Sequence, residues 1–153
     1  MTHAEKAVAL FKEGCNCAQS VFVAFEDMHG LDRETALRLS SGFGAGMGKM
    51  RETCGALTGA FMAAGAMHGY ADLADKQAKI DTYAMIRHIA EEFERQKGTV
   101  ICRELLGIEK GEDLPEPAVR TEEYYRTRPC AGLCELAARI LDEYSLSLSF
   151  PEQ

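Results

Sequence analysis

The stretch Thr53–Gly69, TCGALTGAFMAAGAMHG, decides the fold. Small residues recur in it every four positions, at Gly55, Gly59 and Ala63, and apolar side chains fill most of the other positions. This spacing places the small residues on one face of a helix, where the backbone of another helix can approach closely. The sequence therefore predicts a buried helix with a close helical neighbour.

The rest of the chain also favours helices, and no segment shows the alternation of period two that is typical of a strand. Expected helices, each with an apolar stripe and most with a cap or a glycine stop, cover residues 2–14, 16–30, 32–41, 53–69, 75–97 and 129–144. Short helical segments are expected at residues 100–106 and 119–127. Their buried stripes include Met28, Ile80 and Tyr83. Residues 107–117, acidic and containing two prolines, are expected to form an exposed loop. The prediction is an all-α, compact single-domain bundle of about six or seven helices over residues 1–153.

Composition excludes some classes of function. The 153 residues carry a formal net charge of −7 and no basic run, which argues against binding to nucleic acid or to a membrane surface. The most apolar segment, residues 56–67, is too short to span a bilayer, so we expect no membrane insertion. Nothing at the N-terminus resembles a signal peptide, and a cytoplasmic location is expected.

The six cysteines are the candidate functional residues. In a reducing compartment, cysteines are more often metal ligands, catalytic thiols or core residues than structural disulfides. Four of them fall at the starts of expected helices: Cys17, Cys54, Cys102 and Cys130. Backbone N–H groups and the helix dipole stabilise a thiolate at such a position. We therefore expect lowered pKa values for these four thiols, and rapid alkylation of Cys17 and Cys54 at pH 7.

Two cysteines lie close to this set, since Cys15 precedes Cys17 by two residues and Cys134 follows Cys130 by four. Neither spacing matches a zinc ribbon, a thioredoxin motif or a ferredoxin run, so spacing alone does not name a metal. The glycine-rich residues 42–48 follow an expected helix and lack the Gly-Lys-Ser/Thr of a phosphate-binding loop. They are expected to form a flexible turn that covers the thiol site.

The motifs around the cysteines resemble those of a known family. Residues 54–59 read Cys-Gly-Ala-Leu-Thr-Gly, a CGAxxG motif, preceded by Asn-Cys-Ala-Gln at residues 16–19 and followed by Cys102 and Cys130. Over residues 14–144 this ordered set resembles the C_GCAxxG_C_C family of redox-active proteins, which are bacterial and archaeal domains of about this length. The resemblance implies redox activity or cluster binding. It maps the four characteristic cysteines of the family onto Cys17, Cys54, Cys102 and Cys130, with Cys15 and Cys134 outside the set.

Two functional hypotheses follow. In the first, Cys17, Cys54, Cys102 and Cys130 are catalytic, cofactor-binding and metal-ligating residues of a redox protein that acts with a redox partner protein. They would hold an iron–sulfur cluster or other metal for electron transfer, or act as an oxidoreductase by thiol–disulfide exchange. The bound centre is slightly favoured, because four thiolates satisfy a tetrahedral metal whereas exchange needs only two thiols. The second hypothesis is a non-catalytic helical binding or redox-sensing regulatory module. A homodimer is compatible with both.

Overall fold

The computed structural model describes residues 1–108 and 116–149, so most of the expected acidic loop at 107–117 lies outside the described residues. In the described part, the only extended pairing is an isolated antiparallel bridge between Thr53 and Ile101. The helices are α1 His3–Lys12, α2 Cys17–Ala24, α3 Glu26–His29, α4 Arg33–Ser41, α5 Gly44–Met47, α6 Gly55–His68, α7 Lys76–Lys97, α8 Cys102–Leu106, α9 Glu122–Thr127 and α10 Cys130–Ser149. The all-α prediction is confirmed. None of these described helices is long and apolar enough to cross a membrane.

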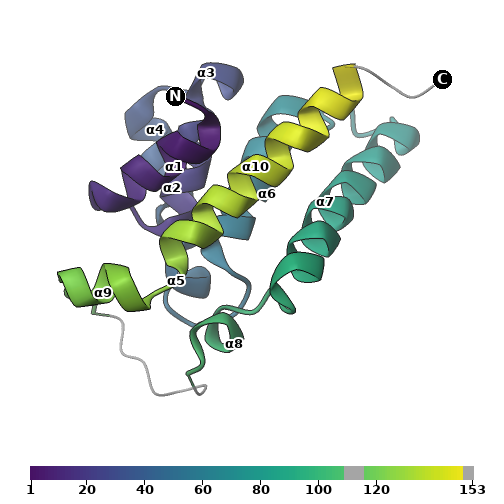
Figure 1. Cartoon of the computed structure of the whole chain (residues 1–153). Helices are drawn as coiled ribbons and strands as arrows, with labels where there is room; N and C mark the ends of the chain where they lie inside the picture. The colour runs from purple at the N-terminus through teal and green to yellow at the C-terminus, as the bar shows by residue number, and fades with distance from the viewer. Residues whose placement is uncertain (109–115, 150–153) are drawn as a thin grey trace.

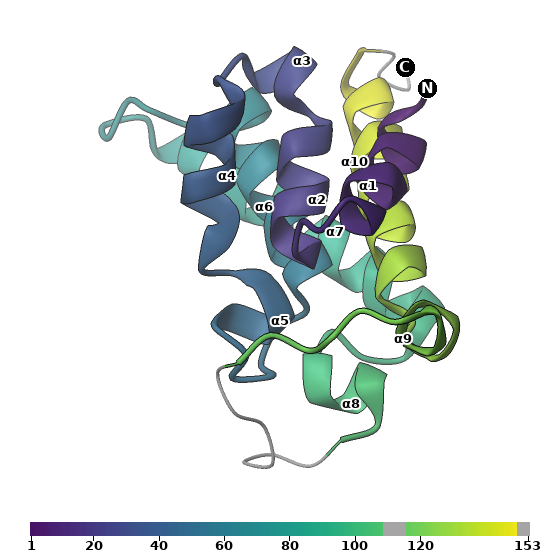
Figure 2. The same ribbon diagram turned by 90° about the vertical axis from the view of Figure 1, so that its left-hand side faces the viewer.

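The longer helices form the body of the bundle, and the short helices α5, α8 and α9 gather at one of its ends (Figures 1 and 2). Helix α2 packs against α1, α4, α6 and α10, while α6 also contacts α10 and α7. The starts of α2, α6 and α10 all lie at the end that carries the short helices. This arrangement places several helix N-termini, and the residues at them, in one region.

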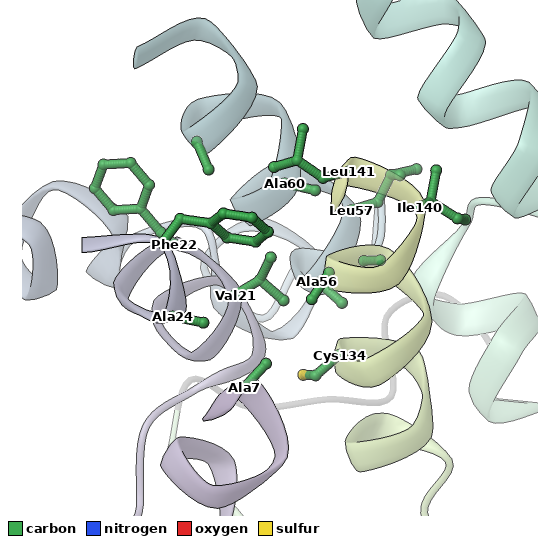
Figure 3. Packing of buried hydrophobic residues seen from close by; sticks show 14 of the residues in the cluster. Ala7, Val21, Phe22, Ala24, Ala56, Leu57, Ala60, Cys134, Ile140 and Leu141 are labelled. Atoms are coloured by element: carbon green, nitrogen blue, oxygen red, sulfur yellow. The ribbon is translucent and has the colours of Figure 1, made fainter. Parts of the chain in front are cut away.

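The close helical neighbour predicted for α6 is α2. A Cβ atom on Gly59 would lie 2.6 Å from the carbonyl oxygen of Ala18 and 3.1 Å from its Cα, so only glycine allows this approach. Ala56 and Ala60 are fully buried on the same helix. Figure 3 shows them with Val21 of α2, in a core that α10 completes. The small-residue pattern thus determines how closely α2 and α6 pack.

Three details of the predicted helices are wrong. The helix expected over residues 16–30 breaks at Phe25, whose φ of −97° and ψ of 16° separate α2 from α3. Because the break reorients the following turn, Met28 leaves the buried stripe and is 54% exposed. Ile80 and Tyr83 are exposed because only the second half of α7, from Met85 onward, contributes residues to the core.

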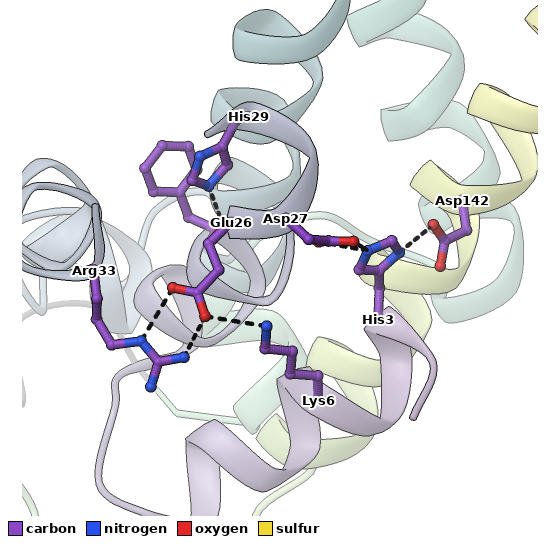
Figure 4. Close-up of polar contacts among 8 residues, drawn as sticks. His3, Lys6, Glu26, Asp27, His29, Arg33 and Asp142 are labelled. Atoms are coloured by element: carbon purple, nitrogen blue, oxygen red, sulfur yellow. Dashed lines mark hydrogen bonds and ion pairs between the residues drawn. The ribbon is translucent and has the colours of Figure 1, made fainter. Parts of the chain in front are cut away.

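Polar contacts hold the N-terminal helix in place at the end opposite the short helices (Figure 4). The His3 ring lies 2.9 Å from the carboxylate of Asp27 and 2.7 Å from that of Asp142, which ties α1 to α3 and α10. Nearby, the Arg33 guanidinium donates hydrogen bonds to Glu26 and lowers the pKa of that carboxyl to about 2. These contacts are structural and lie away from the cysteines.

Candidate thiol site

Four cysteines meet where four helices begin. Cys17, Cys102 and Cys130 are the first residues of α2, α8 and α10, and Cys54 is the N-cap of α6, the position expected for Thr53. All four line a single cavity of about 60 Å³. Cys17 and Cys130 are partly exposed, whereas Cys54 and Cys102 are buried. The structure therefore brings the four predicted site residues together from distant parts of the chain.

The isolated bridge explains why Cys54 and Cys102 lie on the same face of the backbone. On either side of the Thr53–Ile101 pair, the backbone N–H groups of Cys54 and Cys102 each donate a hydrogen bond across the bridge, at 2.8 and 2.6 Å. Successive residues of an extended segment point to opposite faces. Cys54 and Cys102 therefore share the face opposite to the bridge pair, which is the face that lines the cavity.

Two glycines make room for the thiols. A Cβ atom on Gly55 would lie 2.5 Å from the sulfur of Cys17, and one on Gly46 would lie 2.7 Å from the Cβ of Cys102. Real Cβ atoms do not approach other atoms so closely, so any other residue would displace these cysteines. The glycine of the CGAxxG motif thus gives the Cys17 sulfur the space next to Cys54.

The glycine-rich segment beside the site has an unusual backbone. Between residues 45 and 51 the structure has four non-glycine residues with positive φ: Ala45 (55°), Met47 (71°), Lys49 (64°) and Arg51 (58°). Such conformations cost about 1 kcal/mol or more each and persist where the surroundings determine them. Here the carbonyl of Arg51 accepts a hydrogen bond from the N–H of Arg103 in α8. The Arg51 side chain is buried and lies 3.7 Å from the sulfur of Cys102. The segment borders the cavity, as predicted, and it supplies an unpredicted cation.

The expected lowering of the thiol pKa values is wrong for three of the four cysteines. Burial raises the pKa of Cys54, Cys102 and Cys130, the last to about 11, and an ionised Cys17 raises all three further. N–H groups in the first turn of α6 oppose this effect at Cys54, and the Arg51 guanidinium opposes it at Cys102. A helix terminus contributes about 0.3–1 kcal/mol, whereas burial can shift a pKa by several units, so burial dominates.

Stability should therefore fall in alkaline solution. Because the folded-state pKa of Cys130 is raised from about 9 to about 11, its contribution is complete below pH 9 and is lost as the pH rises toward 11. At pH 10 the loss from this thiol is about 1 kcal/mol relative to pH 7. Urea unfolding of the reduced wild type and of Cys130→Ala at pH 7 and pH 10 measures this loss. It is the amount by which the free energy of unfolding falls further in the wild type than in the variant. Equal losses in both proteins would contradict the raised pKa.

The four thiols are also candidate ligands for a metal centre. Four thiolates are a suitable donor set for zinc or an iron–sulfur cluster. Among residues 1–108 and 116–149, however, no three or more His, Cys, Asp or Glu side chains are arranged so that they could hold a metal ion. The iron–sulfur or metal centre expected for these cysteines remains a prediction.

Sequence reasoning missed the basic and aromatic part of the site. Arg120 lines the cavity, donates hydrogen bonds to the carbonyls of Phe11 (2.6 Å) and Cys15 (2.9 Å), and stacks 4.3 Å from the Phe11 ring. Tyr124 of α9 also lines the cavity. Arg120 lies in an irregular segment before α9, because α9 begins at Glu122 and not at residue 119 as the sequence predicted. Cys15 and Cys134 do not line the cavity, although the Cys134 thiol lies 3.8 Å from the carbonyl oxygen of Cys17.

The fold and the site define a class, a helical bundle with a four-cysteine cavity at its end. The family model described as "putative redox-active protein (C_GCAxxG_C_C)" matches residues 15–144, and the chain belongs to this family. Searches of curated proteins and of solved structures found no match. The resemblance inferred from the cysteine motifs is thus confirmed, and redox activity is the property that the family description supplies.

Proposed function

We propose that this protein is a redox protein that acts by thiol–disulfide exchange at the four-cysteine cavity. The observation that carries the proposal is the meeting of Cys17, Cys54, Cys102 and Cys130 around one small cavity, with Cys17 partly exposed and Cys54 buried next to it. Cys17 is central to the group, because its charge raises the pKa of each of the other three thiols. We assign it as the attacking thiol and Cys54 as the resolving thiol.

The reaction takes place in two exchange steps. The Cys17 thiolate attacks one sulfur of a substrate disulfide, a mixed disulfide forms, and the substrate S–S bond breaks with release of a thiolate. Cys54 then attacks the Cys17 sulfur, the mixed disulfide breaks, and the second thiolate leaves with the Cys54 proton. Two electrons pass from the two cysteines to the substrate, which becomes two thiols. A dithiol redox partner reduces the Cys17–Cys54 disulfide to restore the protein.

The pKa relations support this order of events. Burial raises the pKa of Cys54 most strongly, and a negative charge on Cys17 raises it further. Formation of the mixed disulfide removes the Cys17 charge, so Cys54 becomes easier to ionise at the moment when its attack is required. The N–H groups in the first turn of α6 favour the same thiolate.

The test begins with protein purified without oxygen. Metal analysis and a visible spectrum come first, followed by titration with hydroxyethyl disulfide, thiol counting and peptide mapping. We expect two thiols to be lost per chain, with one internal disulfide that contains Cys17. A stoichiometric metal or cluster whose removal exposes all four cysteines to labelling would overturn the proposal in favour of the bound centre. Metal-free protein whose four thiols resist oxidation would instead favour the binding-module hypothesis.

A further inference from the structure

A second cavity lies beside the thiol cavity and is markedly basic. It has a volume of about 310 Å³, and four cations line it: Lys49, Arg51, Arg120 and Arg128. Among the described residues that line it, none is Asp or Glu. The whole chain carries a net charge of −7, so this concentration of positive charge is local and opposite in sign to the rest of the molecule.

The two cavities are continuous in their lining. Asn16, Ala45, Arg51, Arg120 and Tyr124 border both of them. A group held in the basic cavity would therefore lie next to the space that Cys17 and Cys54 share. A volume of this size accommodates a small charged group, and hollows lined by one sign of charge concentrate counter-ions.

Two of the cations are positioned by contacts that leave their charge uncompensated. The Arg120 guanidinium donates to backbone carbonyls and stacks on Phe11, and the Arg128 guanidinium lies 5.6 Å from the centre of the Tyr124 ring. Carbonyls and aromatic rings orient a guanidinium without neutralising it. No ion pair joins either arginine to a carboxylate in the part of the chain that the structure describes.

We propose that the basic cavity binds the anionic group of the redox substrate, which is then a low-mass disulfide that carries a carboxylate or a phosphate. This inference rests on the proposed thiol–disulfide exchange and names its substrate class. The arginines hold the anion while Cys17 attacks the nearer sulfur of the substrate. As in the exchange described above, the disulfide accepts two electrons and two protons and leaves as two thiols, and Cys17 and Cys54 become a disulfide.

The test compares three disulfides that differ in charge: dithiodiglycolate (anionic), hydroxyethyl disulfide (neutral) and cystamine (cationic). Each rate of thiol oxidation in the protein is divided by the rate of the same disulfide with mercaptoethanol, which removes intrinsic reactivity. We expect the anionic disulfide to react about tenfold faster than the neutral one, with the cationic one slowest and the order lost at high salt. Equal corrected rates for all three would overturn the anion site and leave thiol exchange standing.

Substitutions of the cavity cations test whether the preference for the anionic disulfide arises in the basic cavity. Arg128→Gln and Lys49→Gln should each reduce the preference for dithiodiglycolate severalfold. Lys76→Gln, the same change of charge on an exposed residue at the opposite end of α7 from α8, should keep it. Circular dichroism checks that each variant is folded. Because two cavity variants are made, the test can still be carried out if one of them does not fold.

Inorganic phosphate gives a readout that needs no redox chemistry. Its addition to the reduced protein should shift the backbone amide NMR signals of Ala45 and Gly48, and these shifts should weaken in Arg128→Gln. Phosphate binding without any disulfide exchange would overturn the proposed function and the substrate assignment while leaving an anion site. Absence of phosphate shifts together with equal disulfide rates would overturn the site itself.

Discussion

Replacement of Cys17 by alanine is expected to slow oxidation of the protein by a neutral disulfide about tenfold at pH 7. In this variant the attack falls to Cys130, the other partly exposed member of the set, whose pKa burial keeps above its ordinary value even without the Cys17 charge. Its thiolate fraction at pH 7 is therefore small, and the higher intrinsic nucleophilicity of a thiolate with a higher pKa offsets only part of this loss.

The matched control is Cys15→Ala, which removes a partly exposed cysteine two residues away that does not line the cavity. It should oxidise at the wild-type rate and form the same internal disulfide. The rates are followed by thiol counting under hydroxyethyl disulfide without oxygen. If Cys17→Ala oxidises as fast as the wild type, or if Cys15→Ala shows the larger defect, Cys17 is not the attacking thiol.

The most local patterns in the sequence predicted the fold well. The capping box of Asn16 and Gln19 is present at the start of α2, and the small residues of α6 do permit a close helical neighbour. Both depend on residues three or four apart, which one helical turn brings together. The break at Phe25 could not be predicted in this way, because the apolar pattern continues across it and packing of the whole bundle determines where α2 ends.

The sequence selected the cysteines at the cavity but not their environment. Helix starts are marked by local caps, so the positions of Cys17 and Cys130 could be inferred from nearby residues. The pKa of Cys54 depends instead on how deeply the assembled bundle buries it, and burial outweighs the helix terminus there. Arg51 and Arg120 reach the site through irregular backbone. Arg51 has a positive φ, and Arg120 lies before α9, where the sequence had predicted a helix.

Replacement of Gly59 by alanine is expected to lower the free energy of unfolding by about 2 kcal/mol. The new methyl group would lie 2.6 Å from the carbonyl oxygen of Ala18, a backbone atom of α2 that cannot move aside as a flexible side chain would. Overpacking costs about 1–3 kcal/mol, and a contact with rigid backbone places the cost at the upper end, about 3 kcal/mol. The better helix propensity of alanine returns about 1 kcal/mol. Because α6 also begins at the cavity, the displaced helix should expose Cys54 and increase its labelling by an alkylating agent.

Gly65→Ala is the matched control, since it makes the same substitution in the same helix. A Cβ atom there would meet nothing within 4 Å, and Gly65 is exposed. This variant should gain about 0.5–1 kcal/mol from helix propensity and leave the labelling of Cys54 unchanged. Urea unfolding at pH 7 with a reductant should therefore separate the two variants by about 3 kcal/mol. Equal stabilities would mean that the packing of α2 against α6 tolerates an added methyl group. The Cys17 sulfur would then not be confined between these helices.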